Sequence, residues 1–234
     1  MATCGKKCHF HFFKMSNFAA SMEQTFIGAT LGSMVSQAAV RGLNGASGSL
    51  DFVDTLLGGL QTGTAFIAYP VACDYLKKHC PQFRKNFEDP KGCKIAVYVQ
   101  GGMLGAGICT LMNYPLSTIQ KNRKGAEKTP ISLKGAVGFY VDQVGSSVGF
   151  AATMGTLNPI VPTSKNSVLA WARQHLLVNV SNVGGKCVAF PIHYLRHGSS
   201  LTGMIGHYLQ GVPGVIITGD ATAHFKNVLG FMVQ

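Results

Sequence analysis

The sequence has few charged residues and very few acids. Only 12% of its 234 residues are charged, with nine Asp and Glu against twenty Lys and Arg. A soluble domain normally carries about 25% charged residues. The charges lie in short segments between long apolar runs, which is typical of a polytopic membrane protein. In such a protein the net charge of +11 points to anionic lipid or anionic solutes. Aromatic residues are too few in the basic loops for a nucleic-acid surface, so no nucleic-acid partner is expected.

Disulfide frameworks, metal motifs and targeting peptides are also poorly represented. Seven cysteines are an odd number, which excludes a fully paired framework. Cys80 and Cys93 share a polar loop and would pair only in an oxidising compartment, so their redox state stays open. The first fifteen residues lack the apolar core of a signal peptide and do not form a convincing transit peptide. Possible metal ligands near the N-terminus have irregular spacing, and a basic tail is the favoured interpretation: Cys4, Cys8, His9 and His11.

No enzyme signature stands out. We recognise no phosphate-binding loop, no nucleophile elbow and no pair of histidine ligands on one helix. Few acids lie within the apolar runs, so a proton relay is not indicated. The chain is therefore not expected to be an enzyme or to hold a catalytic cofactor or metal.

Six apolar segments follow a basic tail over residues 1–21. Each has about 20 residues or more, which is long enough to cross a bilayer. Their high polar content predicts that much of each helix faces protein or a cavity. In the first segment, Gly28 and Gly32 are four residues apart, a spacing that lets helices approach closely in lipid. The sequence thus predicts an all-α membrane protein with six transmembrane helices, at about residues 22–43, 52–76, 95–122, 135–157, 168–194 and 203–232.

An internal repeat relates these segments in pairs. Gly42, Pro115 and Pro191 recur at nearly equal spacing near the ends of the odd segments. Lys134-Gly135-x-x-Gly138 aligns without a gap with Thr202-Gly203-x-x-Gly206 at the start of even segments. We therefore predict three two-helix repeats with pseudo-three-fold symmetry, over residues 22–94, 95–165 and 166–234. Chance similarity among glycine-rich helices is the alternative.

The arrangement resembles the mitochondrial carrier family over about residues 22–232. Members of that family have three two-helix repeats, with P-x-[DE]-x-x-[KR] ending each odd helix and [FY]-[DE]-x-x-[RK] near the end of each even helix. The charged residues form two ion-pair networks that alternately close a central substrate cavity on the matrix and cytosolic sides.

The gate motifs of this chain are degraded. In the second repeat Pro115 is followed by Ser117 and Gln120, so neither charge is present. In the third repeat Pro191 is followed by His193 and Arg196, so only the base remains. Asp74 and Lys77 keep the spacing of the opposite gate in the first repeat. An ionic gate needs both signs, so the resemblance implies that the matrix-side network cannot form and that transport is lost.

The resemblance also indicates cavity and lipid positions. Gln61, Gln143 and Gln210 lie at comparable depth on the even segments, where they would contact a solute or satisfy each other in a closed bundle. Lys134-Gly135 and Thr202-Gly203 resemble the family's cardiolipin-binding positions, so bound cardiolipin is expected. The further cavity candidates are Asp142, His207 and Lys186, of which Lys186 is a single contact or a snorkelling side chain.

These observations favour a degenerate, transport-inactive carrier that spans the mitochondrial inner membrane several times. Its expected role is that of a structural or accessory subunit of a large inner-membrane complex, such as a respiratory complex or ATP synthase. One alternative is a divergent carrier that still moves a small solute and is gated by hydrogen bonds and packing. Another is an unrelated glycine-rich membrane protein, such as a translocase-like channel subunit. The sequence identifies neither the complex, the solute nor the membrane orientation.

Overall fold

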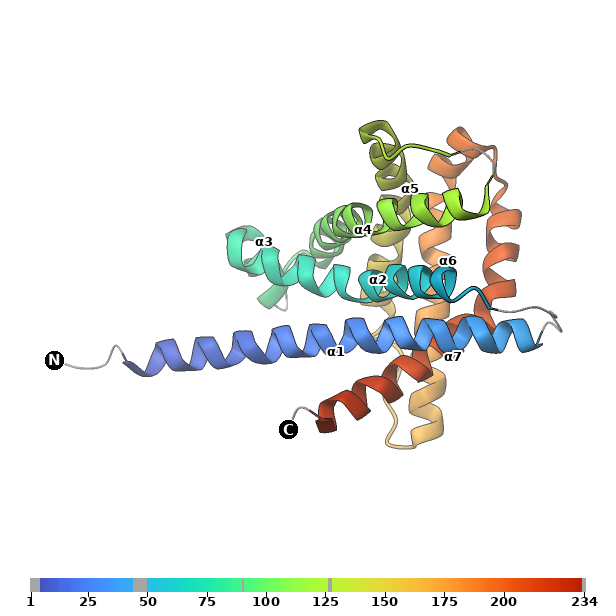
Figure 1. Ribbon diagram of the computed structural model, residues 1–234. Helices are drawn as coiled ribbons and strands as arrows, with labels where there is room; N and C mark the ends of the chain where they lie inside the picture. The colour runs from blue at the N-terminus through green and yellow to red at the C-terminus, as the bar shows by residue number, and fades with distance from the viewer. Residues whose placement is uncertain (1–4, 44–49, 90, 126–127, 233–234) are drawn as a thin grey trace.

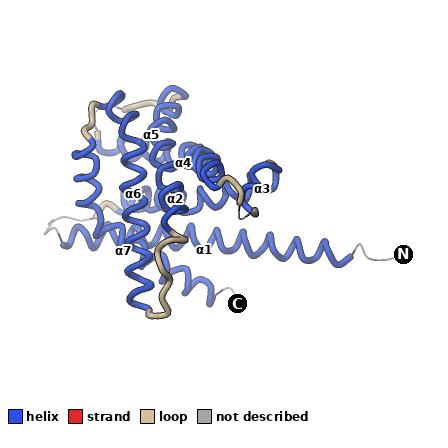
Figure 2. Tube along the Cα trace, turned by 180° about the vertical axis from the view of Figure 1, so that it is seen from behind, coloured by secondary structure: helices blue, strands red, loops and turns tan. Residues whose placement is uncertain are grey.

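The computed structural model describes residues 5–43, 50–89, 91–125 and 128–232, and within these ranges it consists of seven α-helices and their connections (Figures 1 and 2). The all-α class predicted from the sequence is confirmed. The helices are α1 (Gly5–Leu43), α2 (Phe52–His79), α3 (Pro81–Glu88), α4 (Lys94–Lys124), α5 (Leu133–Leu157), α6 (Ser167–His197) and α7 (Leu201–Met232).

The six long helices form a closed ring in chain order. Each of α1, α2, α4, α5 and α6 packs against the next long helix, and α7 packs against α1. The short helix α3 contacts only the helices that flank it, α2 and α4, in the described part of the chain. The contact between α6 and α7 is the least extensive around the ring. Three consecutive two-helix units would give this order of contacts.

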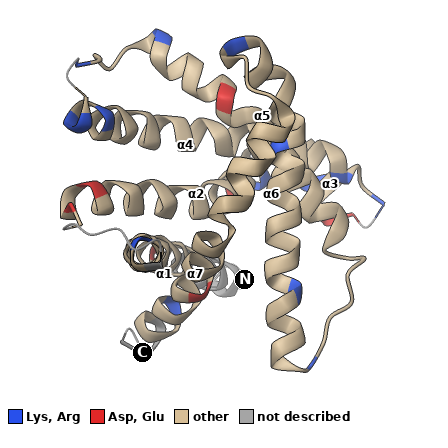
Figure 3. Ribbon diagram, turned by 90° about the vertical axis from the view of Figure 1, so that its right-hand side faces the viewer, with Lys and Arg blue, Asp and Glu red and all other residues tan. Residues whose placement is uncertain are grey.

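The axes of the ring are not parallel. In Figures 1 and 2, α5 and α6 stand upright while α1 lies across the view, and Figure 3 shows α2 and α4 lying across α6. This differs from a bundle whose six helices all run along one axis. Among the described helices, α2 and α4 are long and apolar enough to cross a membrane. The six spans expected from the sequence are therefore not confirmed and stay a prediction.

Two helical segments begin where the sequence predicted none. Helix α1 starts at Gly5, within the region expected to be a tail. The polar loop expected over residues 78–94 contains α3, which starts with Pro81 at its first turn, where a missing amide costs nothing. Phe83 of α3 is fully buried against Cys73 and Val97, and this apolar contact fixes the short helix on α2 and α4. In the first repeat, the segment that corresponds to the gate motif begins at Gly42. Most of it falls within residues 44–49, which lie outside the described residues.

Small and polar side chains dominate the interior, while large apolar side chains face outward. Leu111, Leu133 and Leu195 are 77%, 81% and 83% exposed. Exposed apolar surface on this scale marks contact with lipid or with another protein. The most deeply buried apolar side chains include Ala29, Ala68, Ala72, Ala106, Ala151 and Ala189, and the buried polar ones include Thr30, Ser33, Ser36, Thr64, Thr110 and Ser181. Small residues at helix contacts are typical of helices that pack within a membrane.

Glycines allow the helices to touch backbone to backbone. A Cβ on Gly32 of α1 would lie 2.8 Å from the Thr222 amide nitrogen of α7, and one on Gly28 would lie 3.0 Å from the Thr222 carbonyl oxygen. The close approach predicted from the spacing of Gly28 and Gly32 is thus confirmed. Between α5 and α6, a Cβ on Gly145 would lie 2.9 Å from the Ala189 Cα.

Candidate functional site

An acidic helix start meets a basic helix end between α2 and α4 (Figure 3). Asp51 caps α2, and its Oδ1 accepts hydrogen bonds from the amides of Val53 at 2.9 Å and Asp54 at 3.1 Å. Arg123, in the last turn of α4, lies 2.9 Å from Asp51 Oδ2 and 3.4 Å from Asp54 Oδ1. Lys124 Nζ lies 3.0 Å from Asp54 Oδ2. The acids lie at the N-terminus of α2 and the bases at the C-terminus of α4, where each helix dipole stabilises charges of that sign.

The charged form of Asp51 is favoured by its surroundings. The Asp54 amide and then the Arg123 guanidinium hold the pKa of the Asp51 carboxyl below its usual value of 3.8. A carboxyl whose pKa is lowered in the folded state stabilises the protein fully above its unfolded pKa. That contribution is lost as the pH falls below 3.8 and through the folded pKa.

We expect the midpoint of thermal unfolding to fall as the pH is lowered from 5 to 3, and to fall less in Asp51→Asn. The asparagine keeps a capping oxygen but removes the group that titrates. The measurement is thermal unfolding of the detergent-solubilised chain, with Glu88→Gln, at an exposed residue of α3, as the control variant. Equal pH dependence in the wild type and Asp51→Asn would show that the Asp51–Arg123 ion pair does not contribute to stability.

Neutral hydrogen bonds join the same two helices next to the ion pairs. Gln61 Nε2 of α2 donates to Gln120 Oε1 of α4 at 3.2 Å, and Gln120 Nε2 donates to the Asp54 carbonyl at 3.1 Å. Asn113 Nδ2 of α4 donates to the Gln61 carbonyl at 3.1 Å. A predicted cavity residue, Gln61, is therefore held by a residue of the degraded gate motif. Gln143 and Gln210, on α5 and α7, do not take part in these bonds.

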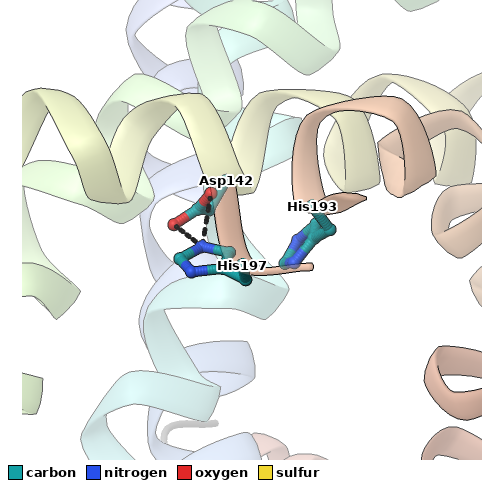
Figure 4. A group of neighbouring side chains, drawn as sticks. All are labelled: Asp142, His193 and His197. Carbon is teal, nitrogen blue, oxygen red and sulfur yellow. Dashed lines mark hydrogen bonds and ion pairs between the residues drawn. The ribbon is translucent and has the colours of Figure 1, made fainter. Parts of the chain in front are cut away.

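A second charged cluster joins α5 to α6 (Figure 4). Asp142 Oδ1 lies 3.1 Å from Arg196 Nε, and both Asp142 carboxylate oxygens lie 3.2 Å from His197 Nε2. His193 lies one turn before His197, with its ring centroid 5.5 Å from that of His197. The structure thus gathers three predicted residues, Asp142, His193 and Arg196, and adds His197.

These clusters differ from the sequence-based expectations in two respects. No pair of histidine ligands was expected on one helix, yet His193 and His197 are four residues apart on α6 and lie with Asp142 as possible metal ligands. Their His-x-x-x-His spacing was the signal that could have found them. Ion pairs also form although the motif acids are missing. Asp142 of α5 pairs with Arg196 of α6, and the acids at the start of α2 pair with the bases at the end of α4. Asp142 is thus an ion-pair partner of Arg196.

The remaining gate candidates do not meet one another. Asp74 pairs with Lys78 of its own helix at 2.6 Å, while the Lys77 ammonium lies 3.6 Å from the centre of the Phe87 ring on α3. Within the described cysteines, Cys80 and Cys93 are both free. The other predicted positions are spread over the ring: Pro115 and Ser117 are half-buried on α4, Pro191 is exposed and Lys186 half-buried on α6, and His207 and Gln210 are exposed on α7.

The expected lipid positions share one local structure. The Gly135 amide donates to Ser132 Oγ at 3.1 Å, and the Gly203 amide donates to Ser200 Oγ at 3.0 Å. Each serine precedes its glycine by three residues and caps the helix that follows. Lys134 and Thr202, the neighbours of these glycines, are exposed. Helices α5 and α7 therefore begin in the same way.

The contact between α6 and α7 has its own polar cluster. Asp220 of α7 accepts hydrogen bonds from Trp171 Nε1 at 3.0 Å and from His175 Nε2 at 2.8 Å. Further along the helices, the Tyr208 hydroxyl donates to Asn179 Oδ1 at 2.5 Å. His175 is buried, so its ring depends on Asp220 for a partner.

A groove of about 390 Å³ lies beside the start of α6 and includes Arg173, Gln174 and Asn158 in its lining. The Arg173 guanidinium donates to the carbonyls of Asn158 at 2.7 Å and Val161 at 3.1 Å, and to Asn158 Oδ1 at 2.9 Å. These bonds hold the loop between α5 and α6 and occupy the cation that an anionic ligand would need.

No family model, curated protein or solved structure matches this chain.

Proposed function

We propose that this chain is a degenerate mitochondrial carrier that no longer transports and acts as a structural or accessory subunit of a large complex of the mitochondrial inner membrane. The observation that carries the proposal is the pairing of its charges. Arg196 is matched by Asp142 of the neighbouring helix α5, and Arg123 by Asp51 and Asp54 of neighbouring α2.

Such pairs tie adjacent helices together, and in the described part of the chain they bind neighbours that stay packed side by side. Alternating access needs two closed states of comparable free energy, each favoured by its own contacts. At the base position of the second repeat, Gln120 is held by a neutral hydrogen bond to Gln61 of α2. These contacts favour one packed state, which suits a structural subunit.

The repeat structure of a carrier is supported by the order of contacts and by the equivalent helix starts. The ring follows the chain from α1 to α7 and closes on α1. Ser132-Leu-Lys-Gly135 and Ser200-Leu-Thr-Gly203 cap α5 and α7 with the same serine-to-amide bond. We include six membrane spans, α1, α2 and α4 to α7, in the proposal. Small side chains in the interior and large apolar side chains on the outside support these six spans, because lipid or a partner would cover the exposed leucines.

Bound cardiolipin is part of the same proposal. A lipid phosphate would use amides of the first turns of α5 and α7 that the serine caps leave open, with Lys134 as the nearby cation. The apolar exterior would supply the acyl chains with contacts and would also bind neighbouring subunits.

The deciding measurement is native gel electrophoresis of mitochondrial membranes solubilised in a mild detergent. We expect the 24.8 kDa chain to migrate with an assembly many times its mass, and to co-purify with the same set of inner-membrane proteins. The purified chain in liposomes is expected to give no uptake of nucleotides, carboxylates or amino acids above protein-free liposomes. A monomer with saturable exchange would overturn the proposal.

A second candidate is a divergent transporter with a neutral gate, in which the hydrogen bond between Gln61 and Gln120 would be a gate contact that breaks and re-forms. This candidate predicts saturable exchange of a small metabolite that weakens in Arg196→Ala or Gln143→Ala. The liposome measurement separates it from the structural role, because only the transporter gives flux that these substitutions reduce.

A further inference from the structure

The cluster between α5 and α6 holds three side chains that bind transition metals. His193 and His197 project from consecutive turns of α6, and Asp142 faces them from α5 (Figure 4). One potential ligand atom from each residue lies within 4.8 Å of the other two. Asp142 and His193 are half-buried, while His197 is exposed, so an ion could reach the cluster from outside.

We propose that Asp142, His193 and His197 form a binding site for a divalent transition-metal cation, with Zn²⁺ as the favoured ion. Two imidazole nitrogens and one carboxylate oxygen suit zinc and its neighbours in the first transition row, whereas magnesium and calcium prefer ligands that are all oxygen. Three protein ligands leave a fourth position for water or another small ligand.

The distances require little rearrangement. Zinc ligands at about 2.0–2.1 Å in a tetrahedral arrangement lie about 3.3 Å from one another. The Asp142 carboxylate and His197 Nε2 are already separated by 3.2 Å. His193 is the ligand that must move, and the movement is short because its nitrogen already lies within 4.8 Å of the other two ligand atoms.

Arg196 positions the carboxylate. Its Nε lies 3.1 Å from Asp142 Oδ1, which leaves Oδ2 for the ion. Metal-binding carboxylates commonly have such an outer hydrogen-bond partner. The guanidinium charge also repels a cation, so binding should be weaker than at a closed structural zinc site. A bound ion would join α5 to α6 and stabilise the folded chain increasingly as the free ion concentration rises above Kd.

The rival explanation is an ion pair between protonated His197 and Asp142 with no metal. The two explanations differ at His193, since the metal site needs its nitrogen, while the ion pair is formed by His197 and Asp142 alone. A substitution at His193 therefore separates them and leaves the Asp142–Arg196 pair in place.

The test is calorimetric titration of the full-length chain, purified in detergent without a polyhistidine tag, with Zn²⁺. We expect His193→Ala, His197→Ala and Asp142→Asn each to weaken one binding event at least about 100-fold, because even loss of an outer partner typically costs about 10–100-fold. His224→Ala, on the exposed surface of α7, is the matched control and should bind like the wild type.

Thiolate ligands elsewhere in the chain are distinguished by Co²⁺, whose absorption spectrum separates sulfur ligands from nitrogen and oxygen ligands. The binding event that these three substitutions weaken is expected to give a Co²⁺ spectrum without thiolate bands. Circular dichroism of His193→Ala establishes that the variant is folded. If folded His193→Ala binds Zn²⁺ with wild-type affinity and stoichiometry, the proposal is wrong, whatever role the chain has in its membrane.

Discussion

Replacing Gly145 by alanine is expected to destabilise the protein by about 1–3 kcal/mol, the typical cost of adding a methyl group to a filled contact. The same exchange within a helix normally stabilises it by about 1 kcal/mol, because alanine has the higher helix propensity. At Gly145 the new Cβ would lie 2.9 Å from the Ala189 Cα and 3.3 Å from its Cβ. A backbone atom cannot rotate away, so α5 and α6 would have to separate.

Gly206→Ala is the matched control. Gly206 also lies inside a long helix, α7, but a Cβ there would have no neighbour within 4 Å. We expect this variant to be as stable as the wild type or up to about 1 kcal/mol more stable. Chemical unfolding in mild detergent, followed by circular dichroism, measures both variants under one condition. Stabilisation by both substitutions would show that α5 and α6 are not in backbone contact.

Most helix ends could be predicted because the sequence marks them locally. The apolar run predicted over residues 135–157 is α5, which begins after the Ser132 cap and ends before Pro159. The run predicted over 168–194 is α6, which begins after the Asn166 cap and ends at His197, before Gly198, whose φ of 66° suits glycine. Short helix α3 was missed because eight residues are too few to establish a helical period, although Phe83 and Phe87 have helical spacing.

The partners of the charges could not be predicted in the same way. In the carrier family the gate charges lie at the end of the first helix of each repeat, so the motif predicts charge partners only on those helices. The pairing of Asp142 with Arg196 depends instead on how α5 and α6 are rotated and offset against each other. That geometry is set by backbone contacts at Gly145 and Gly185, which a one-dimensional pattern does not contain. By contrast, the His193–His197 spacing is local and is visible in the sequence.

Asp220→Ala is expected to destabilise the protein by about 1–3 kcal/mol, the cost of leaving a buried polar group without its partner. The carboxylate accepts hydrogen bonds from His175 at 2.8 Å and from Trp171 at 3.0 Å, and both donors belong to α6. His175 is only 7% exposed, so water cannot easily replace the lost acceptor. The contact between α6 and α7 is the least extensive in the ring, so this loss should open the ring there first.

Hydrogen exchange is the measurement that locates the effect. In Asp220→Ala, amides of α7 near the substitution and of the first turns of α6 should lose protection, while those of α2 and α4 should keep it. Asp220→Asn retains one acceptor oxygen and should recover part of the stability. Asp89→Ala, an exposed acid after α3, is the control and should change little. Uniform loss of protection would indicate that the ring unfolds as one unit. Loss confined to α6 and α7 would identify this contact as the place where the bundle opens, and so where a partner subunit could close it.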